Sequence, residues 1–401
     1  MRREVQVVVS FRPKALHGLI FLMVPLVVAV FAWQKPLYNW DLVPYIGSVL
    51  SREGYSSNQT HALTYKMLRR ELPAQSYRRL IEAHSPPDGD YAWIVMQSSE
   101  SFHQQLPFFN ISWLYIALLQ AIHRVGVSIV RAVSLVSIAS YLGLCFLIFS
   151  WCSRFMQPWP AMVMSWCLSI CPSMLQLPRI ATPDPLSAFV LVLAVYLLLA
   201  REANGWFFAL SVVSIWIRPD NLIVAGFSFA ALWLAQPKRW RLWFGGMLSA
   251  LAAYELLQLA APGYSWAVLF YHSFVSHLAF PAGQTINLTA RMYLHAFGRG
   301  VIALGESSMI SEFLLLGTIG LLAFNCRTQV GNPGRKLPLL AGAMLLSIVV
   351  HFLLYPMVQD RFFIAEFIVL AFAGLSALST SMEAFSQSGA TIVRRPVIAA
   401  D

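Results

Sequence analysis

The stretch ALHGLIFLMVPLVVAVFAWQKPLYNWD, residues 15–41, decides the fold of this chain. Residues 15–33 are almost wholly apolar, and about 20 such residues are enough for a helix to cross a bilayer. Arg12 and Lys14 precede this segment, so we expect an uncleaved span with residues 1–14 in the cytoplasm. Asp41 follows within about three helical turns of the membrane surface. It opens a long polar segment that we therefore expect on the outer side.

The composition indicates a membrane protein. The chain has 401 residues, of which 58% are hydrophobic and 11% are charged, and its mean hydropathy is +0.63. Soluble domains carry about 25% charged residues, so we exclude a large soluble protein. Much of the net charge of +10 lies in short loops between apolar segments. That pattern is typical of cytoplasmic loops, so the charge indicates topology and we expect no nucleic-acid partner.

The apolar segments predict an all-α, polytopic membrane protein with about ten transmembrane helices, because nearly all short basic loops then lie on one side. Amphipathic juxtamembrane helices are expected at 42–52 and 59–83, with a turn at 85–90. Residues 107–122 are short for a span, so we predict a juxtamembrane or re-entrant helix on the outer face. The expected divisions are an outer loop at 34–129, a transmembrane core at 130–261, a second outer loop at 262–297, C-terminal spans at 298–381 and a cytoplasmic tail at 382–401.

A charge in hydrocarbon costs roughly 2.5–3.5 kcal/mol on insertion scales, so a chain keeps one there only when something offsets that cost. The ionisable side chains near the predicted spans therefore indicate where a functional site lies. On the expected topology, acidic residues, arginines and one histidine gather towards the outer ends of the spans. This suggests a charged cavity that opens to the outer side. Its candidate members are Asp41, Arg179, Asp184, Arg218, Asp220, Asp360 and Arg361, with Glu255, His351 and Glu366 slightly deeper.

Most of these residues also have a structural explanation. Asp184, in the sequence TPDP, fits a helix N-cap followed by proline. Asp220 follows Arg218 and Pro219 at a helix break, where a carboxylate complements the helix dipole. Asp360 and Arg361 could form a local ion pair, and Asp41 could be an ordinary interfacial residue. An intramembrane carboxylate such as Glu255 is harder to explain structurally.

The sequence predicts neither a histidine metal site nor a disulfide framework. His272 and His277 are separated by five residues, which suits one helical face poorly. The five cysteines show no CxxC motif and no metal-like spacing with histidine.

The order of these features resembles the GT-C superfamily of integral-membrane glycosyltransferases, which includes protein O-mannosyltransferases and bacterial aminoarabinose transferases. The resemblance is best over residues 15 to about 240. Asp41 matches the family's aspartate in the first outer loop, although it stands without the frequent acidic neighbour. The other matching motifs are Pro107–Tyr115, Arg131–Leu135, Arg179–Ser187 (RIATPDPLS), Ile217–Leu222 (IRPDNL) and Asp360–Phe363 (DRFF).

The resemblance implies an inverting glycosyltransferase that takes its sugar from a polyprenyl-phosphate donor at the outer surface of the membrane. Since the sequence shows no eukaryotic retention signal, we expect a bacterial inner membrane with the active site facing the periplasm. Asp41 would be the general base, and Arg218 and Arg361 would hold the lipid phosphate. Asp184 would orient the acceptor or bind a divalent cation such as Mg²⁺ or Mn²⁺. The donor and membrane lipids are the expected partners. Further substrate-binding residues would be Arg179, Asp220, Glu255 and Asp360.

Two other functions stay open at this point. A transporter or flippase of lipid-linked sugars would explain the charges on the outer side, but such proteins usually contain repeats with broken helices, and no convincing repeat is visible. A non-catalytic membrane partner with a transferase-like fold is the third reading, because Asp41 lacks an acidic neighbour.

Overall fold

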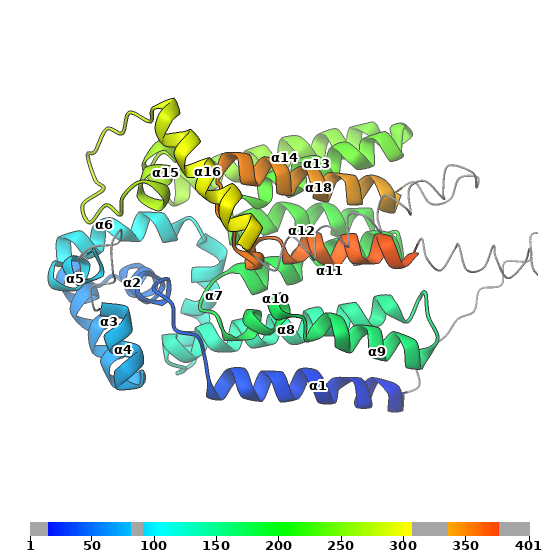
Figure 1. The fold of residues 1–401 in the computed structure, drawn as a ribbon, viewed down its shortest axis with the longest axis horizontal. Coiled ribbons are helices and arrows are strands. Elements are labelled where there is room, and N and C mark those ends of the chain that lie inside the picture. The colour runs from blue at the N-terminus through cyan, green and yellow to red at the C-terminus, as the bar shows by residue number, and fades with distance from the viewer. Residues whose placement is uncertain (1–14, 82–90, 307–335, 377–401) are drawn as a thin grey trace, which may run out of the picture.

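A computed structural model describes residues 15–81, 91–306 and 336–376 of the chain. These residues form helices and connecting loops, and they contain no β-strand beyond one isolated bridge. Figure 1 shows a bundle of long, roughly parallel helices with a cap of shorter helices at one end. The bundle consists of α1 (Ala15–Gln34), α8 (Ile129–Cys152), α9 (Pro158–Ser169), α11 (Asp184–Arg201), α12 (Asn204–Ile217), α13 (Asn221–Ala235), α14 (Trp240–Ala260), α18 (Lys336–Leu354) and the helix Ile364–Ser376.

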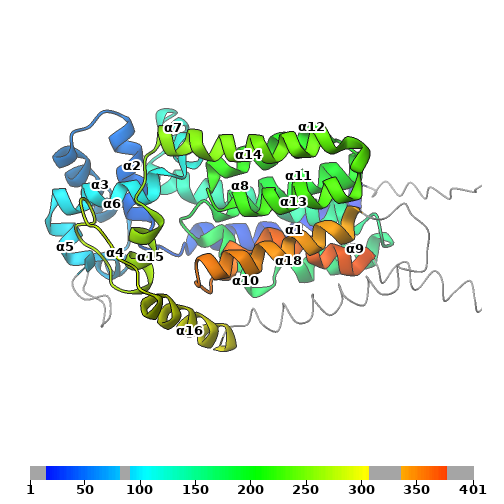
Figure 2. The ribbon, with the colours of Figure 1, turned by 90° about the horizontal axis from the view of Figure 1, so that it is seen from above.

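The cap is built from the two segments that the sequence places in outer loops. Its helices are α2 (Leu42–Arg52), α3 (Ser57–Glu71), α4 (Ala74–Ile81), α5 (Tyr91–Gln97), α6 (Ser99–Asn110), α7 (Trp113–Arg124) and α15 (Trp266–Phe274). The last helix of the second segment, α16 (Ala290–Glu306), runs obliquely beside the bundle (Figures 1 and 2). It begins before residue 298, where we expected the next span to start.

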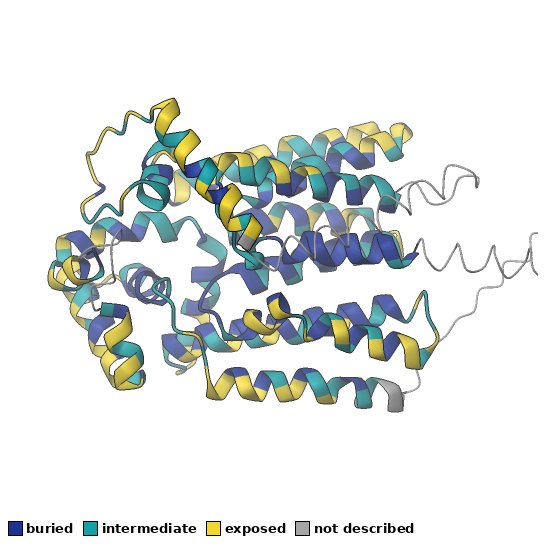
Figure 3. Ribbon diagram, in the orientation of Figure 1, coloured by how far each residue is buried: buried dark blue, intermediate teal, exposed yellow. Residues whose placement is uncertain are grey.

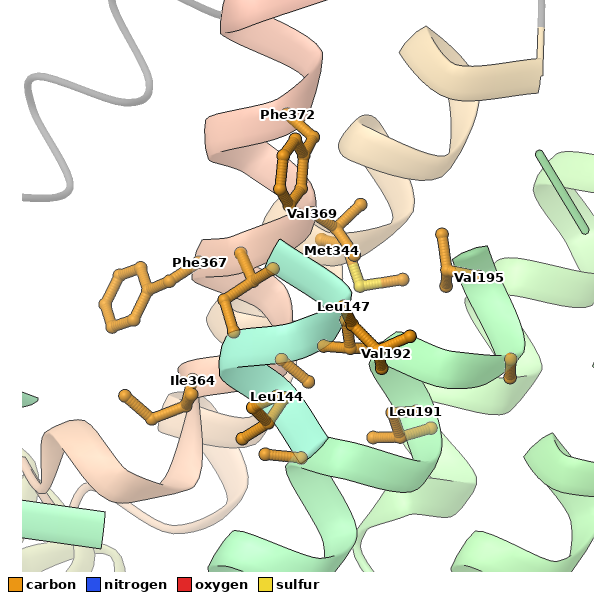
Figure 4. Close-up of a cluster of buried hydrophobic side chains, with 14 of the residues drawn as sticks. Leu144, Leu147, Leu191, Val192, Val195, Met344, Ile364, Phe367, Val369 and Phe372 are labelled. Atoms are coloured by element: carbon orange, nitrogen blue, oxygen red, sulfur yellow. The ribbon is translucent and has the colours of Figure 1, made fainter. Parts of the chain in front are cut away.

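Each layer has its own apolar core. In the cap, Leu42, Ile46 and Val49 lie on one face of α2 and are buried in the core that α2 forms with α3, α6 and α7. A Cβ atom at Gly47 would overlap the ring of Phe102, so glycine is needed for this close approach of α2 and α6. In the bundle, α8, α11, α18 and the last described helix contribute the side chains that meet in Figure 4.

The outward faces of the bundle carry many exposed apolar side chains. Figure 3 shows the exposed side of α1. Val27 of α1 is 70% exposed, and Leu259 of α14 is 80% exposed. Extended exposed apolar surface of this kind marks a membrane or protein contact. Among the described residues, four helices are long and apolar enough to cross a membrane, or six if each of two bent helix pairs counts as one span. The fold is thus consistent with a helical membrane protein, and the figure of about ten spans stays a prediction.

Several predicted elements can be compared directly with the structure. The helix expected at 42–52 is confirmed as α2, whereas the helix expected at 59–83 is interrupted at Leu72–Pro73, between α3 and α4. The expectation of one continuous helix at 107–122 is wrong, because α6 ends at Asn110, α7 starts at Trp113, and the two meet at 110°. Such a bent pair is either a broken span or a re-entrant loop, so the juxtamembrane or re-entrant position stays a prediction. The turn expected at 85–90 lies outside the described residues.

Candidate functional site

Breaks between helices bring charged side chains together where the cap meets the bundle. Asp41 immediately precedes α2, and Asp184 is the first residue of α11. Arg218 and Asp220 occupy the break between α12 and α13. Arg361 belongs to the short 3-10 helix η3 (Asp360–Phe362). We call these five residues the ion-pair cluster.

Arg218 and Arg361 are linked by the carboxylate of Asp184. Arg218 Nη1 lies 2.6 Å from Asp184 Oδ1, and Arg361 Nε lies 3.3 Å from Asp184 Oδ2. At one end of the cluster, Arg361 Nη2 lies 3.4 Å from Asp41 Oδ2. At the other end, Arg218 donates to both carboxylate oxygens of Asp220. The order of contacts is therefore Asp41, Arg361, Asp184, Arg218 and Asp220.

The middle of the cluster is buried and its ends are accessible. The side chain of Asp184 is 3% exposed and that of Arg218 is 10% exposed. The side chains of Asp41 and Asp220 are 26% and 29% exposed. A substrate could therefore reach Asp41 or Asp220, whereas Asp184 is shielded. Three carboxylates face two guanidinium groups, which leaves one negative charge when all five are ionised.

The three aspartate side chains of the cluster do not cap the helices that they precede or begin. Asp41 and Asp220 occupy N-cap positions, but neither side chain makes the capping hydrogen bond to its helix. Asp184 is the first helical residue instead of the expected N-cap, and it accepts a 2.7 Å hydrogen bond from Thr182 Oγ1. Since all three carboxylates bind arginine, capping does not explain their positions.

The two accessible carboxylates differ in basicity. Burial raises the pKa of Asp41 above its ordinary value, and the attraction of Arg361 only partly opposes this effect. Burial acts in the same direction on Asp220, but there the two-point contact with Arg218 prevails and its pKa is lowered. Asp41 is therefore the better proton acceptor of the two at neutral pH.

The remaining candidates lie at different distances from this cluster. His351 Nδ1 is 3.5 Å from Asp220 Oδ2, and the buried Glu366 interacts electrostatically with Arg218. Asp360 accepts a 2.8 Å hydrogen bond from Ser173 Oγ, and the local pair with Arg361 is not observed among the described contacts.

Two candidates stand apart from the ion-pair cluster. Arg179 donates through Nε to the carbonyl oxygen of Lys35 at 3.0 Å, and its guanidinium lies over the ring of Phe31. Glu255 is exposed on α14, on the same face as Leu251 and Leu259. We expected Glu255 to share a chamber with Asp41, but the rotation of α14 directs it to the outside of the bundle.

Sequence reasoning missed the neutral residues that hold the cluster in place. Asn39 Nδ2 donates to Asp41 Oδ2 at 2.7 Å, and Gln359 Oε1 accepts from Arg361 Nε at 2.7 Å. The ring of Phe362 lies 4.7 Å from the Arg218 guanidinium carbon and 5.3 Å from that of Arg361, within cation–π range. Asn39 and Phe362 both stand in motifs that the sequence had singled out, beside the charged residues that drew attention.

The ion-pair cluster does not provide a binding site for the divalent cation that the resemblance implied at Asp184. Both carboxylate oxygens of Asp184 contact arginine, and a cation there would face two guanidinium groups. Within residues 15–81, 91–306 and 336–376, no group of three or more His, Cys, Asp or Glu side chains could hold a metal ion.

Comparisons of the chain with models of protein families, with curated proteins and with solved structures found no match. What can be concluded about the site therefore comes from its own geometry. It combines an accessible carboxylate of raised pKa, a buried arginine–aspartate network and a position at the end of an apolar helical bundle.

Proposed function

We propose that this protein is a GT-C-like membrane glycosyltransferase that moves a sugar from a polyprenyl-phosphate donor to an acceptor hydroxyl. The observation that carries the proposal is Asp41, an accessible carboxylate whose pKa burial raises above the ordinary aspartate value. A multi-pass position in a bacterial inner membrane, with the site facing the periplasm, belongs to the same proposal. Its support is the apolar bundle with the charged cluster at one end.

In the proposed reaction, the acceptor oxygen attacks the anomeric carbon while the Asp41 carboxylate takes its proton. The bond from the anomeric carbon to the phosphate oxygen breaks, and the polyprenyl phosphate leaves with the electron pair. The configuration at the anomeric carbon inverts, because attack and departure take place on opposite faces. General-base catalysis of this kind contributes roughly 10²–10⁴-fold to the rate.

Arg361 is a positioning residue in this proposal. Its Nη2 atom contacts the same oxygen of Asp41 that accepts from Asn39 at 2.7 Å, which leaves the second oxygen, Oδ1, for the acceptor hydroxyl. Arg218 is less suited to the role of phosphate ligand that the resemblance implied. Its guanidinium already binds Asp184 and Asp220 and is only 10% exposed.

Reconstitution tests the proposal against the alternative of a flippase. The purified protein is placed in vesicles with bacterial lipids that include polyprenyl-phosphate sugars, and lipids and acceptors are followed by mass spectrometry. A transferase converts the sugar lipid into free polyprenyl phosphate and a glycosylated acceptor. A flippase moves the intact sugar lipid between leaflets and consumes none of it. If none of the sugar lipid is consumed, whichever acceptor fraction is added, the proposal is contradicted.

The acid limb of the pH–rate profile should lie at a higher pH than an ordinary aspartate would give. A protonated Asp41 cannot accept a proton, so activity falls as the pH drops through its pKa, and burial raises that pKa. The variant Asn39→Ala removes a hydrogen bond that lowers the pKa of Asp41, so its acid limb should move further up. Initial rates across the pH range measure both effects, and an acid limb that moves down in Asn39→Ala would contradict them.

A further inference from the structure

A second polar site is lined in part by residues that shortly precede Asp41 in the chain. It is an open cleft of about 710 Å³ between the end of α1, the end of α3 and the start of α8. Pro36 and Tyr38 line this cleft, and Asp41, three residues later, belongs to the ion-pair cluster. Three residues of extended chain span at most about 11 Å, so the two sites are neighbours.

The charge of the cleft is opposite to that of the ion-pair cluster. Its charged lining residues are Arg70, Arg131 and Glu71, which leave one positive charge. Glu71 is fully engaged, because Oε1 pairs with Arg70 at 3.0 Å and Oε2 accepts from Ser128 Oγ at 2.6 Å. In the described part of the chain, the exposed Arg131 guanidinium has neither an ion pair nor a hydrogen bond.

A neutral hydrogen-bond donor stands beside this guanidinium. Burial raises the pKa of the Tyr38 hydroxyl and Glu71 raises it further, although Arg131 acts in the opposite direction. The hydroxyl therefore keeps its proton at neutral pH. The cleft thus presents a free guanidinium, a second guanidinium that is 71% exposed, and a phenolic donor.

The surroundings of the cleft indicate the source of its ligand. Trp33, which is 44% exposed, lies at its edge and ends the apolar outer face of α1. Along that face, Met23, Val27 and Val30 are 65%, 70% and 56% exposed. A tryptophan at the end of an apolar helix is typical of the membrane–water interface. The cleft therefore lies at headgroup level if α1 is in the bilayer.

We propose that the cleft binds the phosphate headgroup of an anionic membrane lipid, with Arg131 and Arg70 as charged donors and Tyr38 as a third donor. Arginine is well suited to this role, because its planar guanidinium makes paired, charge-assisted hydrogen bonds to phosphate oxygens. The apolar chains of the lipid would lie along the exposed face of α1. This assignment does not depend on the proposed transfer reaction, since it rests on the charge, shape and position of the cleft alone.

Binding of phosphatidic acid to the purified full-length protein in neutral detergent tests the proposal, with phosphatidylcholine as the reference lipid. We expect phosphatidic acid to bind and Arg131→Gln to weaken binding about 10-fold, as the loss of a charge-assisted hydrogen bond implies. Arg70→Gln should also weaken it. Arg69→Gln is the matched control, because Arg69 is an exposed neighbour on the same helix that does not line the cleft. Its affinity should equal that of the unchanged protein.

Three outcomes would overturn the proposal. The first is equal affinity of the unchanged protein for both lipids, which would mean that the net negative charge of the headgroup is not recognised, since phosphatidylcholine carries a phosphate whose charge is neutralised by choline. The second is equal weakening by Arg69→Gln and Arg131→Gln, which would reflect general surface charge. The third is competition by millimolar inorganic phosphate that removes all lipid binding, which would identify a site for free phosphate. Retained binding at that concentration supports the lipid as the ligand.

Discussion

The variant Asp41→Asn should lose sugar transfer by a factor of roughly 10²–10⁴ and keep its fold. Asparagine has the shape of aspartate and can still accept from Arg361, but it cannot take a proton from the acceptor. Folding should be preserved because the side chain is 26% exposed and makes no capping bond to α2. Removing the charge also removes the cost of its burial. The measurements are the initial transfer rate in vesicles and the midpoint of heat unfolding in detergent.

Glu255→Gln is the matched control for this experiment, because it makes the same carboxylate-to-amide change on the exposed face of α14. It should transfer sugar at nearly the rate of the unchanged protein. If Asp41→Asn keeps its rate within a few-fold, Asp41 is not the general base. If Glu255→Gln loses as much as Asp41→Asn, the geometry of the ion-pair cluster does not define the site.

The helices of this protein could be predicted from local patterns, and so could the break at Pro219, but the breaks at residues 72–73 and 111–112 could not. Residues 42–52 form α2 as expected, because Leu42, Ile46 and Val49 repeat at helical spacing. The run at 107–122 is equally apolar, yet it is divided between α6 and α7. Phe102 of α6 packs against Gly47 of α2, more than fifty positions earlier in the chain. Periodicity within one segment carries no information about such a contact.

The candidate site could also be predicted only in part from the sequence. The cost of burying charge singled out Asp41 and Arg361, whose contact joins residues 320 positions apart. It also singled out Glu255, because depth along a span can be counted from the sequence. The direction in which a side chain points around the helix depends on which face of α14 packs inward. Leu251, Glu255 and Leu259 share one face, and only the fold shows that this face is the outer one.

The largest effect on stability is expected for Arg218→Met, which should lower the free energy of unfolding by about 3–5 kcal/mol. Arg218 contacts Asp184 at 2.6 Å and also pairs with Asp220, and its side chain is 10% exposed. Its loss leaves Asp220 with only His351 among the described residues, and Asp184, whose side chain is 3% exposed, with one of its two arginines. Halving the charge pairing of a buried carboxylate costs several kcal/mol, which methionine packing against Phe362 cannot offset. The measurement is unfolding in a single detergent, by heat and by denaturant.

Two further variants distinguish the loss of the Arg218 ion pairs from a general effect of removing an arginine. Arg179→Met removes an arginine outside the ion-pair cluster, which makes one hydrogen bond to a carbonyl oxygen and a cation–π contact. It should lower the free energy of unfolding by about 1 kcal/mol. The double variant Arg218→Met with Asp220→Asn removes Arg218 together with the negative charge of Asp220, which has otherwise lost its arginine. It should therefore be more stable than Arg218→Met alone. A double variant that is less stable than the single one would mean that Arg218 stabilises the fold by packing and not through its ion pair with Asp220.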